Sequence, residues 1–187
     1  MTPTRTASLL QRLIASPYLV LALPLGSAAL LAAAYGFQYW GGLWPCELCL
    51  KQRPPHWAAV GLGLFAFLML KHGQARMTAF LLALMGLILW TGAGVAGFHV
   101  GVEWGWWPGP SSCAVGLLQS DDPAAMAEAL MNAPLVSCEQ VMWSLFGISM
   151  AGYNLLFSAL LGAAALAAAW HWRRKEQHSH GDDRDQP

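Results

Sequence analysis

The stretch MTAFLLALMGLILWTGAGVAGFHVGV, residues 77–102, contains no Asp, Glu, Lys or Arg. A helix needs about 20 mostly apolar residues to cross the hydrocarbon core of a bilayer, so this stretch is long enough to span one. Three further charge-free stretches cover residues 13–46, 54–70 and 140–172. We predict four membrane-spanning helices, of which the second is the shortest and least apolar, near residues 17–37, 54–71, 77–98 and 143–170.

The composition of the whole chain also indicates a membrane protein. Of the 187 residues, 56% are hydrophobic and only 11% are charged, whereas soluble domains carry about a quarter of their residues as charges. Because the apolar stretches are continuous rather than alternating, we expect an all-α fold: one polytopic four-helix membrane bundle covering residues 1–187. Gly92, Gly94 and Gly97 are expected at close contacts between helices. The numbers of basic and acidic residues are equal, so the chain lacks the excess of positive charge that is typical of nucleic-acid-binding proteins.

The basic residues predict the orientation in the membrane. With four spans both termini share one side, and that side collects Arg5, Arg12, Lys71, Arg76, Arg173, Arg174, Lys175 and Arg184. The positive-inside rule places it in the cytoplasm. Two exoplasmic loops follow, near residues 38–53 and 99–142. We expect a short interfacial helix in the second loop, opening at Asp122-Pro123, and a disordered cytoplasmic tail near 173–187.

All four cysteines fall in the two outer loops. Cys46 and Cys49 form C-E-L-C in the first, and Cys113 and Cys138 lie in the second. An oxidising compartment permits one disulfide per loop, among three pairings that four cysteines allow. A bridge across two residues constrains little chain, so the C-x-x-C pair favours redox use, while a structural staple is an equal alternative for the second pair. The spacing of cysteines and histidines is not typical of zinc, and we expect no metal.

Arg53 follows Cys49 by four residues. On a helix the two side chains share a face, and a guanidinium beside a sulfur favours the thiolate. It would also stabilise negative charge on a carbonyl oxygen of a bound oxidant. Pro54 and Pro55 oppose a helix at Arg53, whose alternative role is to anchor the second span at the interface. Because no dinucleotide, haem or iron–sulfur motif is visible, the location at the membrane surface favours a lipid-soluble quinone as electron acceptor.

A further set of motifs extends over both loops and all four predicted helices: Gln38-Tyr39, PCELC at 45–49, Gln52-Arg53, HVGVE at 99–103, GPSSC at 109–113, Cys138-Glu139, GISMA at 147–151 and Tyr153-Asn154. The set resembles the disulfide bond formation protein B (DsbB) family. The resemblance implies a thiol:quinone oxidoreductase of the bacterial inner membrane. Such an enzyme reoxidises a periplasmic thioredoxin-like dithiol oxidase (DsbA) and passes the electrons to ubiquinone or menaquinone, sustaining protein disulfide formation.

The same resemblance implies a role for each candidate residue. Cys113 would form the mixed disulfide with the partner, with Cys138 as its companion. Cys46 would exchange with Cys138, which requires their Cα atoms to come within about 7 Å. Cys49 would face the quinone, with Arg53 polarising a ring oxygen. His99, at the outer end of the third span, would contact the quinone or donate a proton; an interfacial histidine without a catalytic role is its alternative.

Other functions compete with this one. A vitamin K epoxide reductase-like enzyme also joins a dithiol to a quinone, but that family places its C-x-x-C near the last helix, whereas here it precedes the second. Three histidines in the tail, His171, His178 and His180, suggest a metal-binding or transport protein. The tail is short and mixed in charge, however, and the spans lack the charged residues of a transport path. A non-enzymatic membrane scaffold with structural disulfides is the third alternative.

Overall fold

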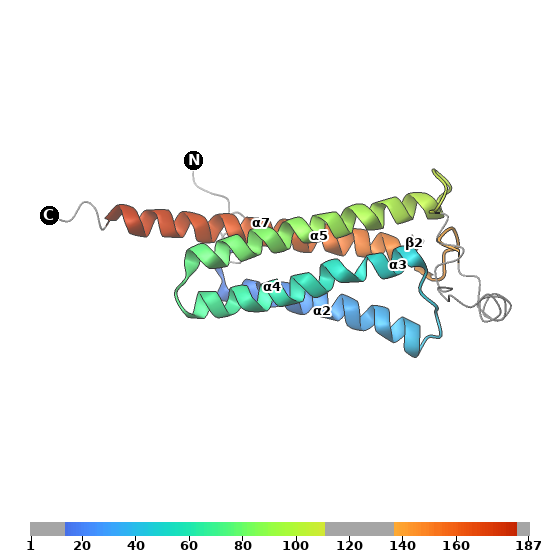
Figure 1. Ribbon diagram of the computed structural model, residues 1–187, viewed down its shortest axis with the longest axis horizontal. Helices are drawn as coiled ribbons and strands as arrows, with labels where there is room; N and C mark the ends of the chain where they lie inside the picture. The colour runs from blue at the N-terminus through green and yellow to red at the C-terminus, as the bar shows by residue number, and fades with distance from the viewer. Residues whose placement is uncertain (1–13, 111–136, 183–187) are drawn as a thin grey trace, which may run out of the picture.

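The computed structural model describes residues 14–110 and 137–182. Within them four long helices lie side by side along the long axis of the molecule (Figure 1): α2 (Pro17–Tyr39), α4 (Arg53–Lys71), α5 (Ala75–Glu103) and α7 (Met150–Asp182). The short helix α3 (Glu47–Lys51) precedes α4. The predicted all-α membrane bundle is confirmed. Cys113 and the interfacial helix expected in the second loop lie outside the described residues.

The four long helices form a closed ring of neighbours. Helix α5 packs against α4 and α7, and α2 packs against the same two helices from the other side. Apolar side chains from all four helices fill the space between them, with Val20 and Leu23 from α2 and Leu82, Met85 and Leu89 from α5 almost fully buried. The ring therefore has one core along its length.

Three helices in the described part of the chain are long and apolar enough to cross a membrane: α2, α5 and the segment Met150–Lys175 of α7. Large apolar side chains such as Phe65, Phe80 and Leu87 are exposed on the outside of the bundle, where lipid tails would cover them. Helix α4 has 19 residues and a polar start, Arg53-Pro54-Pro55-His56, which lowers its hydropathy. That α4 also spans the membrane remains a prediction, supported by its packing between α2 and α5.

Helix α7 differs at both ends from the predicted last span. Strands β1 (Ser144–Leu145) and β2 (Ile148–Ser149) form an antiparallel hairpin, so the helix begins at Met150 rather than near 143. Phe146 and Gly147, the two turn residues, both have positive φ, as a two-residue hairpin turn requires.

At its other end α7 continues to Asp182. The prediction of a disordered tail is therefore wrong for residues 173–182. Two basic side chains of this segment lie over tryptophan rings about one helical turn earlier. The guanidinium of Arg174 is 4.7 Å from the ring centroid of Trp170, and Lys175 Nζ is 5.0 Å from that of Trp172. Such cation–π contacts stabilise the polar end of the helix.

Glycines allow α5 and α7 to approach closely at one level. A Cβ at Gly86 would lie 2.8 Å from Leu166 Cγ and 3.0 Å from the carbonyl oxygen of Gly162. Small residues at such contacts are typical of membrane bundles. Of the glycines expected at close contacts, Gly92 meets Pro55 at 3.0 Å, whereas Gly94 faces open space. Gly97 meets Leu155 at an ordinary 3.7 Å, and the close contact at Gly86 was not among those that the sequence predicted.

Candidate active site

The C-E-L-C motif forms the start of helix α3, at the end of the bundle where the hairpin lies (Figure 1). Cys46 is the N-cap residue, and its Sγ accepts a hydrogen bond of 3.2 Å from the backbone N–H of Cys49. Glu47 in the first turn suits the positive end of the helix and pairs with Lys51 at 2.5 Å. Cys46 is buried, Cys49 is half-buried, and both are free thiols. The local sequence thus fixes two neighbouring thiols at one helix start.

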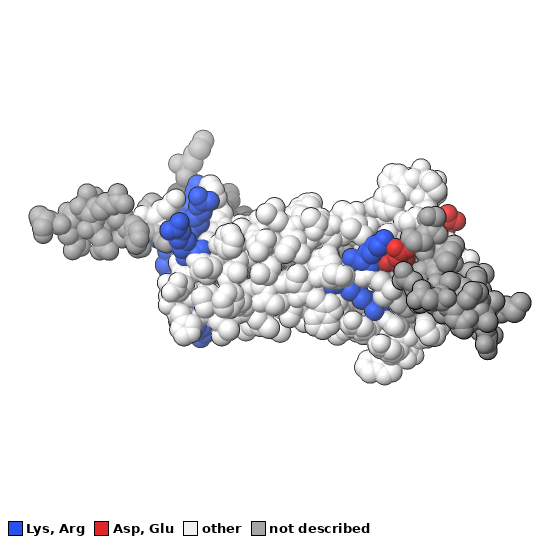
Figure 2. Space-filling view, viewed as in Figure 1, with Lys and Arg blue, Asp and Glu red and all other residues white. Residues whose placement is uncertain are grey.

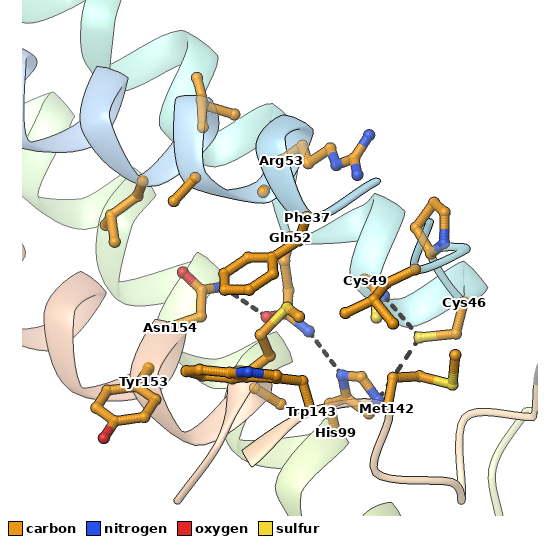
Figure 3. A pocket seen from close by; sticks show the side chains of 18 of the residues that line it. Phe37, Cys46, Cys49, Gln52, Arg53, His99, Met142, Trp143, Tyr153 and Asn154 are labelled. Atoms are coloured by element: carbon orange, nitrogen blue, oxygen red, sulfur yellow. Dashed lines mark hydrogen bonds between the residues drawn. The ribbon is translucent and has the colours of Figure 1, made fainter. Parts of the chain in front are cut away.

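His99 of α5 connects the C-x-x-C pair to the second outer loop. Its Nε2 lies 3.6 Å from Cys46 Sγ (Figure 3), and its ring also hydrogen-bonds the backbone of Cys138. Cys138 is fully buried and disulfide-bonded, and it packs in one cluster with Cys46, Leu48 and Val102. The structure therefore brings together four predicted site residues: Cys46, Cys49, Cys138 and His99.

A chain of amide side chains continues from His99 into the bundle (Figure 3). Gln52 Nε2 donates to His99 Nδ1 at 2.9 Å, and Gln52 Oε1 accepts from Asn154 Nδ2 at 2.5 Å. Asn154 Oδ1 in turn accepts from His56 Nε2 at 2.8 Å. Every donor in this chain therefore points toward the cysteines. Because His99 Nδ1 accepts, a neutral His99 carries its proton on Nε2, facing the sulfur of Cys46.

Sequence reasoning gave Gln52, His56 and Asn154 no role at the site. All three line the same cavity as the cysteines, and Gln52 and His56 are buried. A signal was present, since polar side chains inside apolar membrane helices are expensive and usually functional. His56 and Asn154 both lie in charge-free stretches, where a search for charged residues alone does not find them.

The prolines after Arg53 do not interrupt the helical backbone. Gln52 has αR geometry and joins α3 to α4, and Pro54 and Pro55 occupy the first turn of α4. A missing N–H costs nothing in a first turn, because those N–H groups have no partner within the helix. The expected continuity between Cys49 and Arg53 is therefore present.

Arg53 itself makes contacts on α2. Its Nη2 donates to Gln38 Oε1 at 2.7 Å, and its guanidinium lies 4.5 Å from the ring centroid of Tyr35. Figure 3 shows the guanidinium apart from the two sulfurs, although Arg53 lines the same cavity. Its charge contributes to lowering the pKa of Cys49, but only as a minor influence.

The surroundings shift the pKa values of the two thiols in opposite directions. The hydrogen bond from the Cys46 side chain is the main cause that lowers the pKa of Cys49, and it outweighs the opposing effect of burial. The same hydrogen bond, together with burial and the negative charge on Cys49, raises the pKa of Cys46. Cys49 is therefore the more acidic thiol of the pair, and Cys46 is the less acidic one. A thiolate is the form that attacks or leaves in disulfide exchange.

A cavity of about 310 Å³ lies beside the thiols. Its wall is mostly apolar and aromatic, with Phe37 from α2, Trp143 before the hairpin and Tyr153 from α7 (Figure 3). Its polar lining includes Cys46, Cys49, Gln52, Arg53, His56, His99, Glu103, Gln140 and Asn154. An apolar pocket with few convergent polar groups is the usual form of a small-molecule site.

Comparisons with known proteins identify the family. Residues 16–168 match the family described as Disulfide bond formation protein DsbB. A "Disulfide bond formation protein B" of Verminephrobacter eiseniae is 35% identical over 156 residues, covering 81% of this chain and 85% of the relative. One of Methylococcus capsulatus is 33% identical over 153 residues, covering 79% and 90%. No solved structure matches the chain. Since the matched region includes every helix that builds the cavity, the chain belongs to the DsbB family of disulfide bond formation membrane proteins.

Proposed function

We propose that this protein is a thiol:quinone oxidoreductase that reoxidises a periplasmic DsbA-like dithiol oxidase and passes the electrons to ubiquinone or menaquinone. One observation carries the proposal: the reduced C-x-x-C pair lies on the wall of an apolar cavity in a membrane bundle. A hydrophobic oxidant can therefore reach a dithiol that is largely shielded from water.

The residues of the cavity fit a quinone. Its volume of about 310 Å³ is within the range of small-molecule sites. Phe37, Trp143 and Tyr153 offer aromatic surfaces for a flat ring. Arg53 provides a cation at the same wall that would hold a ring oxygen carrying negative charge. A bound quinone supplies an acceptor for two electrons and two protons, which is what a dithiol releases on forming a disulfide.

The arrangement of the sulfurs supports a direction of exchange. Electrons from the partner would enter at Cys113 and free Cys138 as a thiolate. Cys138 would then attack Cys46 of an oxidised first pair, with Cys49 as the leaving thiolate. The packing of Cys138 with Cys46 favours that attack, and the lowered pKa of Cys49 makes it the better leaving group.

The distribution of charge supports a location in the inner membrane with both termini in the cytoplasm. Figure 2 shows Lys and Arg side chains gathered at one end of the molecule, and an uncharged band between that end and the cysteine end. The first end holds Lys71, Arg76, Arg173, Arg174 and Lys175. By the positive-inside rule the cysteine end then faces the periplasm, where a soluble dithiol partner is available.

Anaerobic mixing of the purified protein with a reduced DsbA-like protein and ubiquinone or menaquinone tests the proposal. We expect quinol formation, followed optically, with the wild type. Cys46→Ser and Cys49→Ser should form none while keeping a folded bundle. Cys113→Ser should fail with the protein partner but still reduce quinone when a small dithiol is supplied. Absence of quinol formation by the wild type with either quinone would refute the proposal.

A further inference from the structure

Glu103 is a further acidic group beside the two thiols. It lies one helical turn after His99 on α5, with its Oε1 3.9 Å from His99 Nε2. Its side chain is almost as buried as that of His99, at 5% and 3% exposure. The sulfurs of Cys46 and Cys49 and a ring nitrogen of His99 all lie within 4.8 Å of one another. Three groups of the type that bind transition metals thus meet at one point on the cavity wall, and the Glu103 carboxylate lies beside one of them, His99.

The distance between Cys46 and His99 matches that between two ligands of a tetrahedral zinc site. With a Zn–S bond of about 2.3 Å and a Zn–N bond of about 2.0–2.1 Å, the sulfur and nitrogen of neighbouring ligands lie about 3.6 Å apart. Cys46 Sγ and His99 Nε2 are separated by 3.6 Å. A nitrogen and a carboxylate oxygen would lie about 3.4 Å apart, so Glu103, at 3.9 Å from His99, needs only a small approach.

The groups behind these four side chains resemble the outer shell of a metal site. A histidine ligand normally uses its second ring nitrogen for a hydrogen bond, and carboxylate ligands are hydrogen-bonded in turn. His99 Nδ1 is held by the side-chain amide of Gln52 at 2.9 Å. Glu103 Oε2 accepts a hydrogen bond from the hydroxyl of Ser149. The two non-sulfur groups are therefore already oriented by partners on other elements.

We propose that Cys46, Cys49, His99 and Glu103 bind a thiophilic divalent cation, Zn²⁺ or Cd²⁺, when the C-x-x-C pair is reduced, and that the bound metal blocks electron transfer. Binding replaces the two thiol protons, which pass to solvent, and moves no electrons. A disulfide between Cys46 and Cys49 removes both thiolates, so the oxidised protein lacks half of the ligands. The site therefore exists in one redox state only.

Metal binding also requires a change in the amide chain. His99 would bind through Nε2, so its proton must move to Nδ1, and Gln52 must turn its amide to present its oxygen there. Asn154, which now donates to Gln52, would then accept from it. Because this rearrangement is confined to hydrogen positions and amide orientation, it leaves the packing of α4 and α7 unchanged.

Titration of the full-length purified protein with Zn²⁺ tests the proposal. We expect one tightly bound Zn²⁺ per reduced chain, and loss of that binding after oxidation of the C-x-x-C pair. His99→Ala and Glu103→Gln should each weaken binding at least about tenfold, the loss that even an outer-shell change produces. The Zn²⁺-loaded reduced protein should form no quinol until a chelator is added. A reduced wild type that binds no stoichiometric Zn²⁺, or oxidised protein that binds it equally well, would overturn the site.

Two controls separate this site from other histidines. His72→Ala, at the far end of α4, and the double variant His178→Ala/His180→Ala should retain the tight binding. Loss of binding in the double variant would assign the metal to the C-terminal segment and disprove the proposal. X-ray absorption of the Zn²⁺-loaded wild type needs no variant and should show two sulfur and two nitrogen or oxygen ligands; any other set contradicts the assignment. Because no quinone or partner is needed for these measurements, their failure leaves the proposed oxidoreductase activity untouched.

Discussion

Cys46 and Cys49 are separated by two residues, yet their surroundings shift their pKa values in opposite directions. Cys46 is buried at the start of α3 and shares a hydrogen bond with its neighbour, which raises its pKa. The same bond lowers the pKa of Cys49. A single proton is therefore held preferentially by Cys46 when one of the two thiols is ionised. This division matches the two roles that disulfide exchange needs, an attacked sulfur and a leaving sulfur.

The acidity of Cys49 predicts the pH dependence of its alkylation in the reduced protein. Only the thiolate reacts, so the rate falls as pH drops through the pKa. Because the pKa of Cys49 lies below its ordinary value of 9.0, we expect the midpoint of its carbamidomethylation by iodoacetamide below that of an ordinary cysteine. Cys46→Ala removes the hydrogen bond and should move the midpoint upward. Mass spectrometry of the modified peptide across pH measures both; an unshifted midpoint in the variant would contradict the assigned cause.

Helices α4 and α7 are joined by a polar contact inside an apolar bundle. Asn154 of α7 bonds to both Gln52, at the start of α4, and His56, one turn further on. Such a contact specifies how the two helices are rotated, because an unpartnered polar group in an apolar interior is costly.

Replacing Asn154 by Leu tests that contact. The variant leaves Gln52 Oε1 without its partner, whereas His56 Nε2 keeps its contact with Ser158 Oγ at 3.3 Å. We expect a loss of about 1–3 kcal/mol in the free energy of unfolding for the buried group left unpaired. Thr91→Val is the control, because its hydroxyl bonds only to Ile88 within the exposed face of α5; we expect a change within about 0.5 kcal/mol. Denaturation in mixed micelles compares the two, and equal effects would argue against the interhelical contact.

Two glycines of α5 offer a matched pair of substitutions. Gly86→Ala places a Cβ against Leu166 and the backbone of Gly162, so we expect a destabilisation of about 1–3 kcal/mol from overpacking. Gly94→Ala meets nothing within 4 Å and should be neutral or stabilise the helix by up to about 1 kcal/mol. Thermal unfolding of both variants in the same detergent checks the order. If Gly94→Ala proves the more damaging change, the α5–α7 contact is misassigned.

These elements show what the sequence could predict. Runs without charge predicted the helical bundle, because the length of an apolar run directly reflects the thickness of the membrane. The hairpin at 144–149 has no such signal, since four strand residues around a turn are too short for a recognisable alternation. Spacing rules did not connect His99 with the C-x-x-C pair, because those rules treat residues close in sequence, and His99 lies 53 residues after Cys46. Side-chain contacts between helices depend on how each helix is rotated about its own axis. No single sequence motif specifies that rotation.

At the scale of the whole molecule, charge divides the bundle into two ends. Lys and Arg gather at one end, and acidic and basic residues mix at the other (Figure 2). The apolar band between them fits a bilayer, and the asymmetry predicts which end faces the cytoplasm.

Labelling of single cysteines checks this orientation. Two sites are introduced into a variant whose four native cysteines are replaced by Ser: Lys51→Cys at the end of α3, just before α4, and His72→Cys just after α4. Both native side chains are exposed. We expect a membrane-impermeant maleimide to label the first in intact spheroplasts and the second only after lysis. Labelling of His72→Cys in intact cells would place the termini outside.

Cys138 is buried in one cluster with Cys46 while the C-x-x-C pair is reduced. In the proposed relay the two sulfur centres therefore start within one buried cluster, and a reaction between groups that are already near each other does not wait for a long diffusive search. Its rate is then set by bond chemistry and is insensitive to the friction of the surrounding liquid. Sucrose that thickens the medium should slow docking of the soluble partner and leave the internal relay at its original speed.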